Sequence, residues 1–269
     1  MAFVGPPTIA SGRSNRAVRH AEFRFYEELN DFLPPEKRKR AFAYEFEGTP
    51  SIRDAIEAVG VPHTEIDVIL VDGRSVGFDH RLRGGERVAV YPMFEAIDIS
   101  PLVRLRPQPL RITRFVVDVH LGALARYLRL IGFDTVWRND LDDRAIVEIA
   151  SRERRIILTR DRGILRHGSV THGYWPRTTD PLAQLEEVVR ALDLATQMRP
   201  YTRCLGCNGL LVPASSAEVA STVPRHVASV QHEFRRCDSC RRVYWPGSHQ
   251  PRLDAIVATA RAAAAGAFR

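Results

Sequence analysis

Long apolar segments are missing from this chain of 269 residues. No run of eighteen apolar residues is present, and no apolar stretch follows the arginines near the N-terminus. A membrane-spanning helix and a secretory signal are therefore not expected. We expect a cytoplasmic protein with no membrane partner.

Lysine is nearly absent as well, with only Lys37 and Lys39 present. Arginine accounts for the rest of the 39 basic residues, and the formal net charge is +7. This charge favours a polyanionic partner such as nucleic acid. A bias in genomic base composition is the alternative explanation for the many arginines.

Cysteine is confined to one part of the chain, between Cys204 and Cys240, which excludes a disulfide framework over the whole molecule. Cys204 and Cys207 form one CxxC pair, and Cys237 and Cys240 form another. Two such turns supply the four sulfur ligands of a tetrahedral zinc site. With no open coordination position the zinc would be structural, and this module would need it to fold. A redox dithiol is the alternative, which the repeated pair disfavours.

Composition and periodicity divide the chain into six segments. Two strands, a helix and two further strands predict an α+β domain of the β-grasp type, whereas alternating strands and helices predict a parallel sheet. The segments are a flexible tail (1–20), the β-grasp domain (21–100), a proline-rich basic linker (101–110), the α/β domain (111–197), the zinc module (198–250) and an alanine-rich tail without an evident partner (251–269).

Within the β-grasp domain, alternating apolar and polar residues predict strands over 21–33 and 41–46. Thr49 or Ser51 would cap a helix that ends at Gly60. A further strand would run into an Asp72–Gly73 turn, and the last strand would follow Gly84 and Gly85.

Aspartates follow the apolar strands of the α/β domain. Asp118 ends the first strand and Asp161 follows a later one, so both are expected at the carboxyl edge of the sheet, where ligands bind. Asp140 and Asp143 precede a helix at the same edge. Carboxylates gathered there need a cation, and oxygen ligands suit Mg²⁺ or Mn²⁺. Helix capping is the alternative role for Asp140, Asp142, Asp143 and Asp180, and it is the favoured one for Asp142.

Arginines beside these aspartates are candidate substrate ligands. Arg126 and Arg129 are three residues apart on a helix, and Arg160 and Arg162 flank Asp161. Neutralisation of nearby acids or surface solvation is the alternative. Around the second CxxC pair, aromatic and basic residues would either bind phosphates and an unpaired base or pack the module against its neighbour. They are Arg235, Arg236, Arg241, Arg242, Tyr244 and Trp245.

The segment from Phe115 to His249 resembles a known family through VDVHLGALARYLRLIGFDT, RIILTRDRGIL, RCLGCNGLL and FRRCDSCRRVYWPGSH. It is similar to the PIN-like ribonuclease domain with fused zinc ribbon at the C-terminus of Mut-seven-type exonucleases. Residues from Glu22 to Asp98 resemble the ubiquitin-like β-grasp module that bacterial members carry. The resemblance implies an α/β PIN-like parallel sheet with helices on both faces, a zinc ribbon and an N-terminal β-grasp domain.

The same resemblance implies cleavage of RNA with a divalent metal. Asp118 and Asp161 match two acidic positions of the family, Asp140 or Asp143 matches a third, and Asp180 matches a fourth loosely. The expected function is a ribonuclease, acting as an endonuclease on structured RNA such as tRNA, with a possible protein partner on the β-grasp domain. An inactive RNA-binding adaptor and the toxin of a toxin–antitoxin pair are the alternatives. The β-grasp module also resembles small sulfur carrier proteins, which end in a free Gly-Gly. Sulfur transfer is not expected here, because the Gly84–Gly85 pair lies inside the domain.

Overall fold

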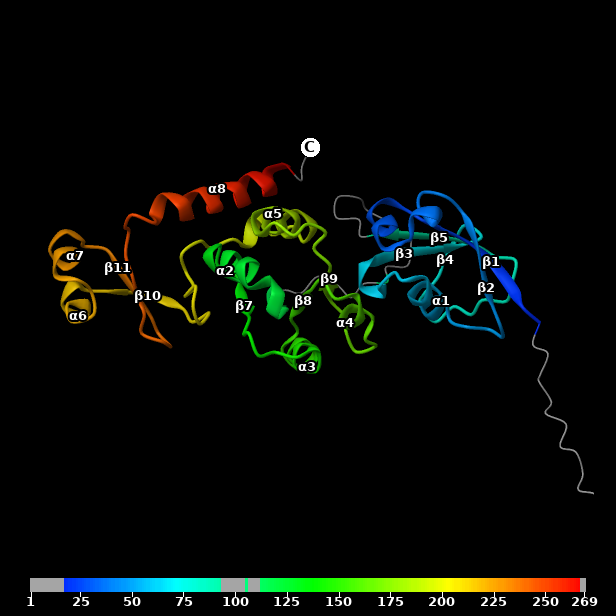
Figure 1. Cartoon of the computed structure of the whole chain (residues 1–269), viewed down its shortest axis with the longest axis horizontal. Coiled ribbons are helices and arrows are strands. Elements are labelled where there is room, and N and C mark those ends of the chain that lie inside the picture. Colours follow the sequence, from blue (N-terminus) through cyan, green and yellow to red (C-terminus); the bar gives the residue numbers. More distant parts are fainter. Residues whose placement is uncertain (1–16, 93–104, 106–111, 267–269) are drawn as a thin grey trace, which may run out of the picture.

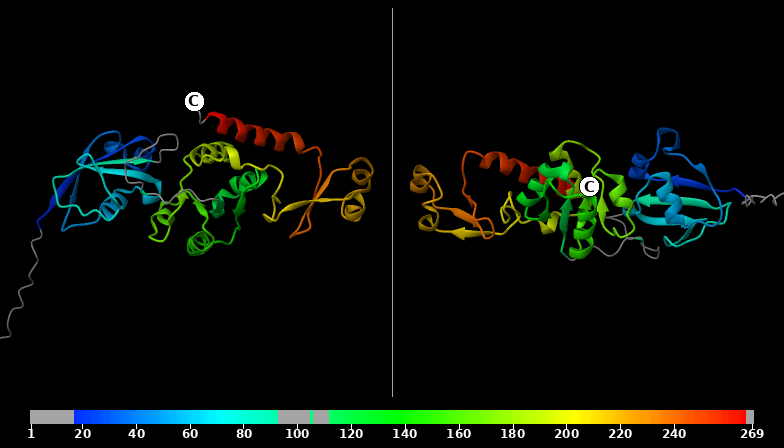
Figure 2. Two further views of the ribbon diagram at one scale, coloured as in Figure 1. Left: turned by 180° about the vertical axis from the view of Figure 1, so that it is seen from behind. Right: turned by 60° about the horizontal axis from the view of Figure 1, so that its bottom comes forward.

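A computed structural model describes residues 17–92, 105 and 112–266 (Figure 1). Three folded parts follow one another along the long axis of the molecule, and the last helix returns over the middle part (Figures 1 and 2). The predicted linker 101–110 lies outside the described residues except for Leu105, and so do residues 1–16 of the predicted tail. Among the described residues, no helix is long and apolar enough to cross a membrane.

The N-terminal part is a mixed five-stranded sheet in the order β2-β1-β5-β3-β4, with β1 parallel to β5 and the other pairs antiparallel. Ser51 caps α1, and Gly60 ends it in the left-handed conformation, as expected. The β-grasp arrangement is thus confirmed. Its elements are β1 (Arg19–Phe25), η1 (Glu27–Phe32), η2 (Pro35–Lys37), β2 (Phe42–Phe46), α1 (Ile52–Val59), η3 (His63–Glu65), β3 (Ile66–Val71), β4 (Arg74–Ser75) and β5 (Arg87–Pro92).

The first strand is shorter than predicted. It ends at Phe25, and residues 27–32 form the 3-10 helix η1 rather than continuing the strand to 33. The Asn30 side chain donates to the carbonyl oxygens of Phe25 and Glu27 and accepts from the Lys39 N–H. These bonds replace the ladder bonds that a longer strand would make, and Leu29 and Phe32 still reach the core from the helix.

The middle part contains a parallel four-stranded sheet in the order β7-β6-β8-β9. Side chains alternate between its faces, so that Phe115 and Val117 contact one core and Val116 contacts another. Helices cover both faces, as predicted. The elements are β6 (Arg114–Val117), η4 (Val119–Leu121), α2 (Gly122–Leu130), β7 (Asp134–Val136), α3 (Asp143–Glu153), β8 (Ile156–Leu158), α4 (Arg162–Arg166), β9 (Gly173–Tyr174), α5 (Pro181–Ala191) and η5 (Ala195–Gln197).

The cysteine-bearing part is a small antiparallel sheet in the order β10-β11-β12. Two short helices between the cysteine pairs pack on it through Val219 and Val227. The elements are β10 (Leu211–Ala214), α6 (Ser216–Val219), α7 (Arg225–Val230), β11 (Phe234–Cys237) and β12 (Val243–Tyr244).

The alanine-rich C-terminal segment has a partner that the sequence did not reveal. Residues Gln250–Gly266 form α8, which lies along α5 (Figure 1). Ile256, Val257 and Ala260 join the core made by α2, α5 and the sheet. Because small alanine side chains let helices approach closely, a segment without a strong apolar stripe still packs on the α/β domain.

The β-grasp domain is attached to the α/β domain through buried polar contacts. The Glu65 carboxylate, which is only 3% exposed, accepts from the Trp175 N–H at 2.9 Å and from Arg177 Nη2 at 3.0 Å. His63 Nε2 lies 2.8 Å from the carbonyl oxygen of Val170. These bonds hold η3 against the segments that precede and follow β9.

Candidate active site and metal centre

Asp118 and Asp161 lie at the carboxyl ends of β6 and β8, which are adjacent parallel strands. Thr159, the first residue after β8, connects them. Its hydroxyl donates to Asp118 Oδ2 at 2.6 Å and accepts from the Asp161 N–H at 2.9 Å. Thr159 is fully buried and Asp118 is 6% exposed, so the bond between them is shielded from water.

Each of the two aspartates keeps one carboxylate oxygen free of hydrogen bonds within the described residues. Asp118 uses Oδ2 for Thr159, whereas Asp161 uses Oδ1 to accept from the Gly163 N–H at 2.6 Å and so caps α4. The capping bond orients Asp161 relative to the sheet. Each carboxylate is therefore held by hydrogen bonds through one oxygen, while its other oxygen makes none within the described residues.

The other predicted acidic residues are not gathered around this pair. Asp140 is 70% exposed and lies 3.1 Å from Arg138. Asp143 begins α3 on the surface, next to Asp142, which caps that helix as expected. Asp180 caps α5, its Oδ1 accepting from the N–H groups of Leu182 and Ala183. In the described part of the chain, the four cysteines are the only group of three or more potential ligands whose ligand atoms lie together.

A groove of about 880 Å³ borders the candidate site between α3 and α4. Asp143 lines it at the start of α3, and Gly163, two residues after Asp161, lines it at the start of α4. Arg144 and Arg152 contribute positive charge, and Arg144 is exposed. Arg152 is paired with Glu148, which also lines the groove, so Arg144 is the groove arginine without an ion pair in the described part of the chain.

Arg129 is buried rather than at the helix surface, in contrast to the prediction. It is 2% exposed, and its guanidinium donates to four carbonyl oxygens, those of Thr135, Trp137, Leu205 and Gly206. Arg129 thereby joins α2 and β7 to the first cysteine turn, and its donors are not available to a phosphate. Its neighbour Arg126 is exposed.

Arg160 and Arg162 also make contacts within the protein, although they were predicted as substrate ligands. Arg160 Nη1 donates to the carbonyl oxygens of residues 176, 177 and 178. Arg162 donates to the carbonyl oxygens of Asp31 and Phe32 and lies over the rings of Phe32 and Trp175. Arg162 thus binds the β-grasp domain, which sequence reasoning could not foresee because the contact spans 130 residues.

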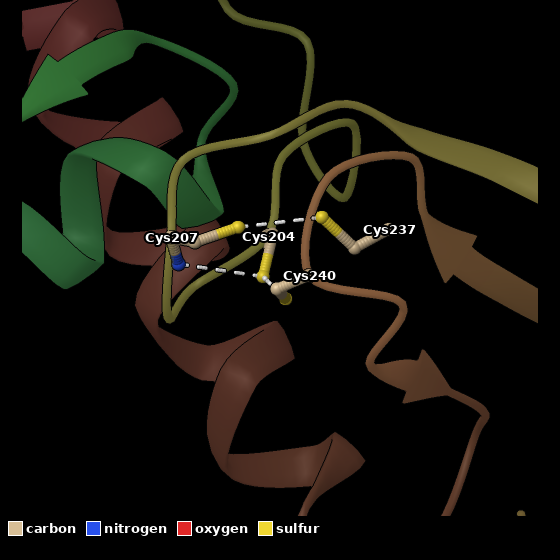
Figure 3. Close-up of side chains that lie close together, drawn as sticks. All are labelled: Cys204, Cys207, Cys237 and Cys240. Atoms are coloured by element: carbon tan, nitrogen blue, oxygen red, sulfur yellow. Dashed lines mark hydrogen bonds between the residues drawn. The ribbon is translucent and has the colours of Figure 1, made fainter.

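Four thiols meet between the two cysteine turns (Figure 3). Their sulfur atoms all lie within 4.8 Å of one another, at 3.4 Å for Cys207 and Cys237 and 3.6 Å for Cys204 and Cys240. Sulfurs around a tetrahedral zinc ion with bonds of about 2.3 Å are about 3.8 Å apart. All four cysteines are free, and their arrangement fits a metal ion such as zinc.

Tyr244 supports this cluster and was not predicted to do so specifically. Its hydroxyl donates to Cys204 Sγ at 3.0 Å and accepts from the Leu205 N–H at 3.1 Å. Burial raises the pKa of the Cys204 thiol, but hydrogen bonds from Tyr244 and from backbone N–H groups outweigh it and lower the pKa to about 6. Burial and the bond to Cys204 raise the pKa of Tyr244 to about 12, which keeps its hydroxyl protonated. A thiolate is the form that binds a metal.

Asn208, directly after the first cysteine pair, joins the cluster to the parallel sheet. Its side chain donates to Asp134 Oδ1 at 2.8 Å and accepts from the Thr135 N–H at 3.0 Å. Asp134 also pairs with Arg155 at 2.7 Å. The sequence showed the CxxC spacing but gave no signal for these contacts or for Thr159, because each depends on residues distant in the chain.

Comparison with protein families identifies both folded regions. Residues 113–257 match the model of the Mut7-C RNAse domain, and residues 18–98 match that of the Mut7-C ubiquitin domain. Neither the curated proteins nor the solved structures include a significant match to this chain. The first region extends from β6 into α8 and includes Asp118, Thr159, Asp161 and the four cysteines. Since it covers more than half of the chain, this protein belongs to the Mut7-C RNAse family and carries a Mut7-C ubiquitin module before the RNAse domain.

Proposed function

We propose that the protein is a metal-dependent ribonuclease that cuts structured RNA, such as tRNA, at internal phosphodiester bonds. The observation that carries the proposal is the Asp118–Thr159–Asp161 arrangement at the carboxyl edge of the sheet, inside a region that matches an RNAse domain. Ligands bind at this edge in open α/β sheets.

The two aspartates fit a Mg²⁺ or Mn²⁺ site. Mg²⁺ in phosphoryl-transfer sites is held by one or two carboxylates together with water and substrate phosphate, so a cage of four acidic ligands is not required. Asp118 and Asp161 would hold the ion through their free oxygens. When bound, the ion supplies charge for the phosphate and lowers the pKa of water.

The protein groups have separate tasks in this proposal. Thr159 fixes the direction of the Asp118 carboxylate, and the Gly163 N–H fixes that of Asp161. Of the arginines predicted as phosphate contacts beside the aspartates, Arg126 on the exposed side of α2 makes no ion pair or side-chain hydrogen bond within the described residues, and Arg144 in the neighbouring groove is a further candidate. We expect the RNA backbone to follow the α3–α4 groove. Asp143, which lines that groove, would approach the metal ion as a further acidic group.

Incubation of the purified full chain with tRNA and with a single-stranded RNA, each with Mg²⁺, Mn²⁺ or neither, tests the proposal. Cleavage should require the metal and should be lost in Asp118→Asn and Asp161→Asn. Asp193→Asn is the matched control, since it removes the same charge from an exposed position that is not among the candidate acidic residues. Labelling either end of the RNA separates internal cutting from trimming.

Binding of RNA without cutting under every metal condition would overturn the enzyme and leave the adaptor as the function. Equal cutting by the wild type and both aspartate variants would instead assign the cleavage to a contaminant or another site.

A protein partner for the ubiquitin-like module is a separate expectation. Affinity capture with residues 18–98 intact and with that module deleted would test it.

A further inference from the structure

A second concave surface lies away from the candidate active site, where the cysteine-bearing sheet meets α8 and the end of α2. Its volume is about 620 Å³. Aromatic and aliphatic side chains line most of it, and two arginines are also among its lining residues. The lining includes Tyr201, Arg203, Phe234, Arg235, Trp245 and Leu253.

We propose that this groove binds a single-stranded segment of RNA by stacking its bases on Trp245 and Tyr201. The inference rests on the proposed ribonuclease function and adds a second RNA contact to it. Proteins hold unpaired bases by stacking them on aromatic rings, with a basic side chain nearby that binds the phosphate backbone of the RNA.

The two rings are held in place while part of each stays open to solvent. Trp245 and Tyr201 are both partly exposed. The buried Phe234 packs beside Trp245 with ring centroids 6.5 Å apart, and the Tyr201 hydroxyl donates to Asp254 of α8. A ring held in this way loses little freedom when a base stacks on it.

The charge of this region complements a polyanion. Residues 198–250 contain seven arginines against three acidic residues, whereas residues 112–197 contain thirteen arginines against twelve. Within the lining, Arg203 is paired with Asp134, but Arg235 is exposed and makes no ion pair or side-chain hydrogen bond within the described residues. Glu233 is the acidic residue of the lining, next to His232. Arg235 is therefore the cation that is free to bind a phosphate.

The position of the groove makes the contact distinct from the site of cutting. Leu130 lines the groove and is the last residue of α2, whereas Asp118 lies before the first residue of that helix. Nine helical residues span about 13 Å. An RNA that reaches both places would extend over several nucleotides, with an unpaired part in the groove and the cleaved bond at Asp118 and Asp161.

Binding is tested with the full chain in an Asp118→Asn background, so that the RNA stays intact. The probes are a fluorescein-labelled oligouridine of twelve nucleotides, an abasic ribose-phosphate strand of the same length and a twelve-base-pair RNA duplex. Fluorescence anisotropy at fixed salt gives the three dissociation constants. Zinc content and thermal melting confirm that each variant is folded.

Trp245→Leu should weaken oligouridine binding about tenfold, since stacking contributes about 1–3 kcal/mol per base, and should leave the abasic strand unaffected. Tyr201→Leu is the second variant if Trp245→Leu does not fold. Arg235→Gln should weaken both single strands more than the matched control Arg225→Gln, which removes the same charge from an exposed position outside the groove.

Equal affinity for oligouridine and the abasic strand, or equal effects of Arg235→Gln and Arg225→Gln, would overturn the groove as a base-binding site. So would tighter binding of the duplex than of the single strand. These outcomes are independent of cleavage. If oligouridine binds as expected but wild-type protein cuts no RNA with either metal, the proposed ribonuclease function fails and the groove assignment stands.

Discussion

Thr159 contributes more to the candidate active site than its neutral side chain suggests. It is fully buried, and its single hydroxyl serves both aspartates at once, as a donor to Asp118 and as an acceptor for the Asp161 N–H. A buried hydroxyl with both bonds made restricts the rotation of the carboxylate that it contacts. Thr159 is thus a positioning residue that acts through Asp118.

Replacement of Thr159 by valine should lower RNA cleavage about 10- to 100-fold, as loss of groups that orient metal ligands commonly does. Valine has nearly the same shape but leaves the Asp161 N–H without its acceptor. Thr159→Ser keeps the hydroxyl and should retain most of the activity. Steady-state cleavage rates over a Mg²⁺ titration measure the effect, with thermal melting as the folding control. If valine and serine variants cut equally well, the hydroxyl does not position Asp118.

Arg129 and Arg126 provide a second comparison between single residues, since they are three residues apart on α2. Arg129→Met should destabilise the protein by about 3 kcal/mol, because four carbonyl oxygens lose a charged donor. Arg126→Met should change stability by less than about 0.5 kcal/mol, as exposed substitutions usually do. Urea unfolding of the zinc-loaded protein measures both. Similar values for the two variants would show that Arg129 does not hold the first cysteine turn.

At the scale of elements, α8 decides whether the C-terminal segment is a tail or part of the fold. Ala260 is fully buried against the α2–α5 core, whereas Ala258, half a turn away, is exposed. Ala260→Glu should cost about 3 kcal/mol or more, because it places an uncompensated charge in an apolar contact. The melting temperature should fall by about 6–12 °C.

Ala258→Glu adds the same residue to the solvent side of α8 and should leave the melting temperature nearly unchanged. Both variants are compared by differential scanning calorimetry under the same buffer conditions. A melting temperature that is insensitive to Ala260→Glu would mean that α8 is detached in solution.

The cysteine turns form the other element whose state can be measured directly. We expect one zinc ion per chain and its loss in Cys237→Ser, since this thiol is fully buried within the cluster. Loss of the ion should unfold β10–β12, because the small core of Val219, Val227 and Phe234 does not suffice alone. Metal analysis and circular dichroism before and after chelation check the expectation. A folded, reduced protein without zinc would contradict it.

At the scale of the whole molecule, Arg177 joins the ubiquitin-like module to the RNAse domain. It lies 3.0 Å from Glu65 of the former and 3.6 Å from Glu187 of the latter. Burial lowers the pKa of Arg177, but the surrounding carboxylates outweigh it and raise the pKa, so the guanidinium stays charged. The two domains are therefore expected to tumble as one body in solution.

Arg177→Met should weaken domain docking by about 3–5 kcal/mol, because it removes the guanidinium that lies 3.0 Å from the buried Glu65 carboxylate. The double variant Arg177→Met with Glu65→Gln should recover part of this loss, since it also removes the buried negative charge that Arg177 offsets. Small-angle scattering should show a larger radius of gyration for the single variant. An unchanged radius in that variant would show that other contacts, such as that of Arg162 with Phe32, suffice to hold the domains.

Local patterns in the sequence determined the class of each domain and the metal-binding cysteines. A CxxC turn places two sulfurs side by side through local geometry alone, and alternating apolar residues show which strands are buried and in what order they occur. The aspartates at the ends of β6 and β8 were found for the same reason, since the carboxyl ends of parallel strands meet at one edge.

Only the tertiary structure decided which polar side chains make internal hydrogen bonds and so are not available to a ligand. Arg129, Arg160 and Arg162 carry the charge expected of phosphate ligands, but each donates to carbonyl oxygens that become accessible to it only when distant segments pack together. Thr159 has no sequence signal, and the aromatic cluster that includes Tyr244 gave no sign of the bond to Cys204, because a hydroxyl group acquires its role only from the atoms around it. The sequence specifies the position of each residue along its helix or strand, whereas the packing of distant segments specifies which atoms its side chain contacts.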